Sequence, residues 1–99
     1  MWYAIISEDI ENSLSKRMQA RPAHLARLHQ LKDAGRLFAA GPHPAIDNSE
    51  PAEEGFTGSF VIAEFDNLES AQEWADNDPY LEAGVYAKVI VKPYLKVLP

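Results

Sequence analysis

The chain has 99 residues, of which 46% are hydrophobic, and this size is typical of a single domain that spans residues 1–99. Its formal net charge is −6, from 9 basic and 15 acidic side chains, which argues against nucleic-acid binding because that function relies on Lys and Arg. It has no cysteine for a disulfide or a thiolate nucleophile, no apolar run near the roughly 20 residues of a membrane span and no signal-peptide pattern, which together predict a cytoplasmic protein without a membrane partner.

The first elements are a strand and a helix. The stretch "WYAIIS", residues 2–7, is rich in β-branched and aromatic residues and predicts a strand that runs into a polar loop. A helical pattern starts near Arg21, with Pro22 in the first turn, where its missing N–H costs nothing. Gly35 suits the position just after the helix end, and residues 12–20 predict a helical turn that Pro22 separates or bends. The apolar positions of the helix are Leu25, Leu28, Leu31 and Ala34.

Two strands and a long loop come next. "RLFAAGP", residues 36–42, predicts a second strand that ends at the "GPHP" motif. Residues 44–55 are rich in proline, acids and small polar residues, and this length exceeds the usual few residues of a connection. Because long ordered loops are often functional, we interpret this loop as a flap. "GSFVIAEF", residues 58–65, predicts a third strand.

The remaining elements are a second helix and a last strand. "DNLESAQEWADNDP", residues 66–79, has the spacing of a helix, and Asp66 and Glu69 resemble a capping box at its start. Pro79 ends this helix, because a residue that precedes proline avoids helical angles. "GVYAKVIVKPY", residues 84–94, predicts the fourth strand.

The order βαββαβ predicts an α+β, ferredoxin-like fold: a four-stranded antiparallel sheet with two helices on one face. Such a sheet usually leaves its second face polar, but both faces of the last two strands are apolar here. The alternating sets are Phe60 and Ile62 against Val61, Ala63 and Phe65, then Val85, Ala87, Val89 and Val91 against Tyr86 and Ile90. One set packs against the helices. The opposite set needs a second cover, which a chain of this length cannot supply by itself. We therefore predict a homodimer that forms sheet against sheet, as a dimeric α+β barrel.

The same connectivity collects polar and small residues at one end of the sheet. The end of the first strand lies there beside the start of the first helix, the connection between the second and third strands, and the start of the fourth strand. The candidate site residues at this end are His24, Asp78, Ser59, Tyr80, Arg21, Gly41, Pro42 and Gly58. The convergence of these side chains predicts a site for a small molecule.

A carboxylate beside an imidazole has a definite chemical use. It holds the ring in one tautomer and stabilises the charged ring, so Asp78 would make His24 a better general base. Ser59 would donate a hydrogen bond to a substrate, Tyr80 would donate one or stack, and Arg21 would bind an anionic group. Glycines in the site would let the backbone approach a ligand closely.

Each of these residues also has a plain structural interpretation. His24 suits a packed core position, Asp78 a helix or turn cap, and the glycines suit turns. Of the other histidines, His29 falls on the opposite side of the helix and His43 lies in a loop. The three histidines do not have metal-ligand spacing, and no G-x-G-x-x-G follows a strand, so we expect neither a metal nor a nucleotide cofactor.

Several motifs occur together in a familiar order: "RPAHLARL", "GRLFAAGPHPAID", "GFTGSFVIAEF", "ADNDPYLEAGVY" and "VIVKPYLKV". Through them the whole chain resembles the YciI-like (YCII-related) family. That resemblance implies a ferredoxin-like fold, dimers of the α+β barrel kind, an architecture similar to muconolactone isomerases, and a relative that dehydrochlorinates a chlorinated hydroxyquinol. It also implies a histidine–aspartate centre at His24 and Asp78, in a pocket lined by Ser59 and by the backbone around Gly41 and Pro42.

The residues and the resemblance together favour a small-molecule enzyme with acid–base chemistry. Elimination, isomerisation or hydrolysis of a small hydroxylated aromatic compound, a lactone or an acid fits a histidine–aspartate pair. The alternative is a non-catalytic metabolite-binding or accessory homodimer, and a third possibility is an interaction module whose pocket is vestigial.

Overall fold

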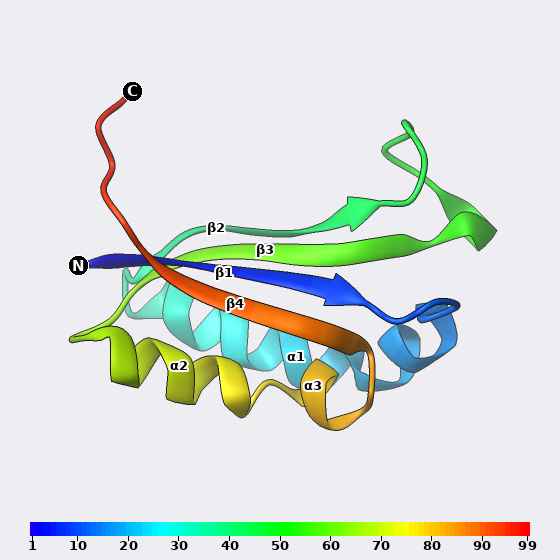
Figure 1. The fold of residues 1–99 in the computed structure, drawn as a ribbon, viewed down its shortest axis with the longest axis horizontal. Helices are drawn as coiled ribbons and strands as arrows, with labels where there is room; N and C mark the ends of the chain where they lie inside the picture. The colour runs from blue at the N-terminus through cyan, green and yellow to red at the C-terminus, as the bar shows by residue number, and fades with distance from the viewer.

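The computed structural model describes residues 1–99 and contains one sheet and three α-helices (Figure 1). The strands are β1 (Trp2–Asp9), β2 (Leu37–Pro44), β3 (Phe56–Glu64) and β4 (Tyr86–Tyr94). The helices are α1 (Leu14–Asp33), α2 (Leu68–Asp76) and α3 (Pro79–Glu82), and a 3-10 turn, η1, covers Ala52–Glu54. None of these helices combines the length and the apolar character that crossing a membrane requires.

The sheet has the strand order β2-β3-β1-β4, and every neighbouring pair is antiparallel. The chain crosses from β1 through α1 to β2, and from β3 through α2 and α3 to β4. All three helices lie against one face of the sheet, and no helix covers the other (Figure 1). The predicted ferredoxin-like arrangement is thus confirmed, with α3 as an addition.

The core lies between the helices and the inward-facing side chains of β1 and β3. Val61, Ala63 and Phe65 form the alternating set of β3 that faces inward, and each is at most 4% exposed. The other members of this cluster are Tyr3, Ile5, Leu28, Leu31, Ala71 and Ala75. Full burial of a large apolar side chain contributes roughly 1.5–3 kcal/mol, so this cluster fixes α1 and α2 on the sheet.

A smaller cluster of Tyr80, Val85 and Tyr86 lies where α3 meets the start of β4. Simple alternation predicts that Tyr86 shares a face with Ile90, and this prediction is wrong. The pairing between β1 and β4 shifts register between Glu8 and Asp9, so Tyr86 turns toward the helices and is buried. A bulge of this kind redirects side chains at the end of a ladder.

Helix α1 begins at Leu14, well before the predicted start, and Pro22 lies in its interior. An interior proline removes one hydrogen bond and crowds the preceding turn, at a cost of about 3 kcal/mol. The turns before it are nevertheless held by a tertiary contact, the buried ion pair of Arg17 with Asp9 of β1. His24 therefore lies in the middle of α1 and not in its first turn.

The segment after β3 differs from the prediction in its caps. The side-chain oxygen of Asn67, and not of Asp66, caps α2 by accepting a hydrogen bond from the Ser70 N–H at 2.8 Å. Helix α2 ends at Asp76, and Pro79, the predicted end of this helix, instead starts α3. Proline suits the first turn of a helix because it has no N–H that needs a partner.

The sequence predicts that the second strand ends at the "GPHP" motif, after residue 42. Strand β2 instead continues through this motif to Pro44. Proline is tolerated in edge strands, and β2 is an edge strand of this sheet. Residues 45–55 form the predicted loop, which includes η1 and is closed by a hydrogen bond from the N–H of Ala45 to the carbonyl of Gly55 at 2.9 Å. The flap function of this loop stays a prediction.

Candidate active site

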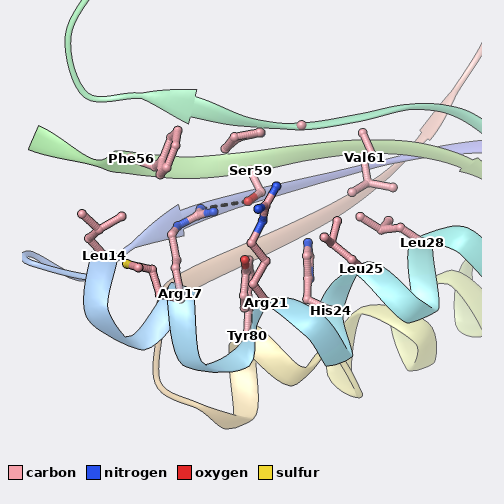
Figure 2. A pocket seen from close by; sticks show the side chains of 14 residues that line it. Leu14, Arg17, Arg21, His24, Leu25, Leu28, Phe56, Ser59, Val61 and Tyr80 are labelled. Carbon is pink, nitrogen blue, oxygen red and sulfur yellow. Dashed lines mark hydrogen bonds between the residues drawn. The ribbon is translucent and has the colours of Figure 1, made fainter. Parts of the chain in front are cut away.

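A cavity of about 380 Å³ opens between α1 and the strands β2 and β3 (Figure 2). This volume lies at the lower end of the range for small-molecule sites, roughly 300–1,000 Å³. The polar side chains that line it are Arg17, Arg21, His24, Ser59 and Tyr80. The remaining lining residues are Leu14, Met18, Leu25, Leu28, Ala40, Gly41, Pro42, Phe56 and Val61.

His24 and Asp78 are in contact. Nδ1 of the ring lies 2.9 Å from Oδ1 of Asp78, and both residues are buried. The same Oδ1 accepts the backbone N–H of Tyr80 at 2.9 Å, so one carboxylate caps α3 and holds the imidazole. Since a carboxylate can only accept, Nδ1 donates, and the neutral ring presents Nε2 as an acceptor. No protein group pairs with Nε2.

The ring of Tyr80 fixes the orientation of His24 from a second side. The two rings are stacked, with centroids 3.8 Å apart and an angle of 7° between their planes. In Figure 2 both side chains extend from the helices toward the sheet. Burial raises the pKa of Tyr80, against the opposing charges of Arg17 and Arg21, so its phenol stays neutral near pH 7.

The other predicted site residues divide into two groups. Arg21, Ser59, Gly41 and Pro42 line the cavity together with His24 and Tyr80. Arg21 is exposed and takes part in no ion pair; the ion pair of the chain is Asp9–Arg17, and the neutral ring of His24 forms a hydrogen bond with Asp78. Its free guanidinium lies between Arg17 and His24 in Figure 2.

Gly58 does not line the cavity. A Cβ atom at this position would lie 2.1 Å from the backbone oxygen of Ser7 on the neighbouring strand. Its carbonyl accepts a hydrogen bond from Nη2 of Arg17 at 2.8 Å. The role of Gly58 is therefore the close approach of β3 to β1 and not the approach of a ligand.

Arg17 is the cavity residue that sequence reasoning missed. Its Nε and Nη2 donate to the two carboxylate oxygens of Asp9 at 2.6 and 2.9 Å, and Nη2 also contacts Ser59 Oγ at 2.9 Å. Ser13 donates to Asp9 as well, at 2.6 Å. Arg17 precedes Arg21 by four residues and His24 by seven, so one helical face carries all three. A helix that continued through Pro22 in the prediction would have revealed this face.

Burial and charge act against each other at Arg17. Burial alone would lower its pKa, but the hydrogen bond and the charge of Asp9 outweigh this effect, and the pKa is raised.

The nearby phenol of Tyr86 behaves like that of Tyr80. Burial raises its pKa far above the ordinary value, although a hydrogen bond with Ser59 opposes this effect. Arg17 thus stays charged and Tyr86 neutral.

The other histidines lie apart from this site. His29 is exposed on α1, and His43 is exposed on β2, where its ring lies 6.3 Å from that of Phe60. No group of three or more His, Cys, Asp or Glu side chains is arranged to hold a metal ion. The polar groups at the cavity are one imidazole with its carboxylate, two guanidinium groups, a hydroxyl and a phenol, inside mostly apolar walls.

Comparison with known proteins places this fold and cavity in a family. The family model of the YCII-related domain matches residues 1–95. The chain is 60% identical over 97 residues to Protein YciI of Escherichia coli and to an uncharacterized protein of Haemophilus influenzae, in each case over 98% of this chain and 99% of the relative.

Among solved structures, the 5-chloro-2-hydroxyhydroquinone dehydrochlorinase of Burkholderia phenoliruptrix, in complex with 2,5-dihydroxybenzoquinone, is similar with a TM-score of 0.84. It is 30% identical, and the match covers 96% of this chain and 94% of that chain. The match of sequence and fold extends over nearly the whole length. The chain belongs to the YCII-related domain family.

Proposed function

We propose that this protein is an acid–base enzyme that acts on a small ring compound, with His24 as the general base and Asp78 as the group that orients it. The main support is the hydrogen bond of 2.9 Å between His24 Nδ1 and Asp78 Oδ1, in a ring that lines the cavity. In this arrangement Nε2 takes a proton from the substrate, and Asp78 stabilises the imidazolium that forms. Ser59, Tyr80 and Arg21 would bind the substrate.

The reaction class that best fits is an elimination. In a non-aromatic keto tautomer of the ring, His24 removes a proton from a tetrahedral ring carbon, and the electron pair of the C–H bond forms a double bond to the neighbouring tetrahedral carbon, which carries the leaving group. The leaving group departs from that carbon with its own bonding pair, so the net change is the loss of one molecule of acid. A dehydrochlorinase at 30% identity and a TM-score of 0.84 supports this choice over isomerisation or hydrolysis.

The test is a turnover assay with a defined panel of compounds. We would offer the native chain 5-chloro-2-hydroxyhydroquinone, unchlorinated hydroquinones and small lactones, and follow chloride release and ring absorbance. We expect turnover of at least one compound, and His24→Asn should lower kcat by about 10²- to 10⁴-fold, because a positioned general base contributes a factor of this size. Asp78→Asn should also lower kcat, because it removes the carboxylate that fixes the ring.

His29→Asn is the matched control, since it changes an exposed histidine of the same helix. It should leave kcat unchanged. If the native chain binds members of the panel but converts none of them, the acid–base proposal is wrong, and a non-catalytic metabolite-binding or accessory dimer becomes the better description.

We also propose that the protein forms a homodimer through the helix-free face of the sheet. Phe60 and Ile90 lie on this face, and the C-terminal residues Leu95, Val97 and Leu98 are 76–78% exposed. In Figure 1 this terminal segment extends away on the side of the sheet opposite the helices. A second copy would remove these apolar groups from water, which is favourable in proportion to the area buried.

Sedimentation equilibrium measures this assembly directly. We expect twice the chain mass for the native protein and a monomer for Ile90→Glu, which places a charge in the centre of the proposed interface. Leu68→Glu is the control, because Leu68 is 45% exposed on α2, away from that face. It should remain dimeric, and a native chain that sediments as a monomer would contradict the proposal.

A further inference from the structure

The guanidinium of Arg17 is fixed more firmly than a structural ion pair requires. Both carboxylate oxygens of Asp9 accept hydrogen bonds from it. Three aromatic rings also lie close to the guanidinium carbon, with ring centres at 5.0 Å (Tyr80), 5.3 Å (Phe56) and 6.0 Å (Tyr86). Aromatic faces attract a cation at these distances. The group is therefore held in one orientation before any ligand arrives.

One side of this guanidinium has no partner in the protein. Nε and Nη2 donate to Asp9, Gly58 and Ser59, whereas Nη1 donates no hydrogen bond in the chain, although the phenol of Tyr80 also interacts with the guanidinium. The only buried side-chain polar atom without a partner in the chain is Nη1 of Arg27, so solvent reaches Nη1 of Arg17. Because Arg17 lines the cavity, these two N–H groups are open to a ligand there.

Ser59, like Arg17, has a hydrogen-bond donor that is free for a ligand. Its oxygen accepts a hydrogen bond from Arg17, and its second lone pair can accept from the neutral phenol of Tyr86, which leaves the hydroxyl proton free to point into the cavity. Ser59 also lines the cavity, and Figure 2 shows its hydroxyl beside the guanidinium of Arg17. The two residues therefore place neighbouring donors at one end of the cavity.

The charge of the cavity lining points to a ligand of opposite sign. Two guanidinium groups and no carboxylate line the cavity, although the whole chain has a net charge of −6. The Arg17 charge is compensated by Asp9, but that of Arg21 is not. An anion that enters this cavity would thus meet both free donors and a net positive charge.

We propose that Arg17 and Ser59 form a subsite for an ionised ring oxygen of the substrate, and that Asp9 is the residue that positions Arg17 for this role. The inference rests on the proposed function in that it takes the substrate to be the ring compound that His24 deprotonates. Arg17 and His24 are seven residues apart on α1, which corresponds to about 10 Å along the helix axis. A single planar ring fits between the two ends, with its oxygen at Arg17 and Ser59 and its reacting carbon near His24.

A binding experiment without turnover tests this subsite separately from the acid–base chemistry. The probes are 4-nitrophenol, at a mildly alkaline pH at which it is ionised, and 4-nitroanisole, which has the same ring but no charge. Titration followed by the visible band of the phenolate gives its affinity, and calorimetry gives that of the ether. We expect the native chain to bind the phenolate at least roughly tenfold more tightly than the ether, as charge-assisted hydrogen bonds predict.

Three variants show which residues cause the tighter binding of the phenolate. Ser59→Ala and Arg17→Lys should each reduce it to less than about threefold, since each removes part of the pair of donors. His24→Asn should keep it, because the base lies at the other end. Ser59→Ala retains the ion pair with Asp9, so it decides the question even if Arg17→Lys fails to fold.

Two results would overturn the subsite. One is a native chain that binds the phenolate no better than the ether, or binds neither at millimolar concentration. The other is a preference that survives Ser59→Ala but disappears in Arg21→Gln, which would place the anion at the exposed guanidinium. A purely structural role of Arg17 would alter the affinity for both probes equally. If the preference is as expected but no compound is turned over, the subsite stands and the acid–base proposal fails.

Discussion

Replacing Arg17 with methionine should lower the free energy of unfolding by about 3–5 kcal/mol, because it leaves a buried carboxylate without its partner. The side chains of Arg17 and Asp9 are 6% and 1% exposed, so water cannot replace the lost contacts. Urea unfolding followed by circular dichroism measures the effect as a lower midpoint with an unchanged slope.

The double variant Arg17→Met, Asp9→Leu is the informative partner of this experiment. Removing both charges together avoids the orphaned carboxylate, so the double variant should be more stable than Arg17→Met alone. A loss below about 1 kcal/mol for the single variant would mean that solvent reaches Asp9 and that the ion pair does not hold the start of α1.

The second large effect is expected at Gly58. An alanine Cβ there would lie 2.1 Å from the Ser7 carbonyl oxygen, and both atoms belong to paired strands in the middle of the sheet. Neither strand can move without breaking its ladder, so Gly58→Ala should cost about 3 kcal/mol or more, at the upper end of the usual cost of overpacking.

Gly41→Ala is the matched control for this substitution, because a Cβ at Gly41 meets nothing within 4 Å. It should change the free energy of unfolding by no more than about 0.5 kcal/mol. Thermal unfolding of the two variants side by side checks both expectations, and equal midpoints would show that β3 can shift away from β1.

Hydrophobic spacing was sufficient to predict the order of the elements and much of the core. Alternation along β3 separates Val61 and Ala63 from Phe60, which is more exposed, although Ile62 on the face of Phe60 is buried as well. Predictions from hydrophobic spacing failed at two places, where a strand loses its regular alternation and where a helix continues through a proline. Tyr86 follows a bulge in the ladder, and Pro22 lies inside a helix that tertiary contacts maintain.

The candidate site shows the same division. Connectivity alone predicted that His24, Asp78 and Ser59 lie near one another, since it depends only on the order of the elements. It could not give the hydrogen bond of 2.9 Å between His24 and Asp78, whose positions are 54 residues apart in the chain. It also could not reveal that one carboxylate both caps α3 and holds the imidazole.

The amino-acid sequence by itself therefore determined the ferredoxin-like topology, because this topology follows from periodicity and element order. The tertiary structure decided that α1 passes through Pro22, that Arg17 reaches the cavity and that Gly58 lets the backbones of β3 and β1 approach closely. These features depend on contacts between distant segments, such as that of Arg17 with Gly58 across 41 residues. The spacing of residues along the chain cannot predict such contacts, because they form and stabilise the fold only when the strands and the helix are packed together.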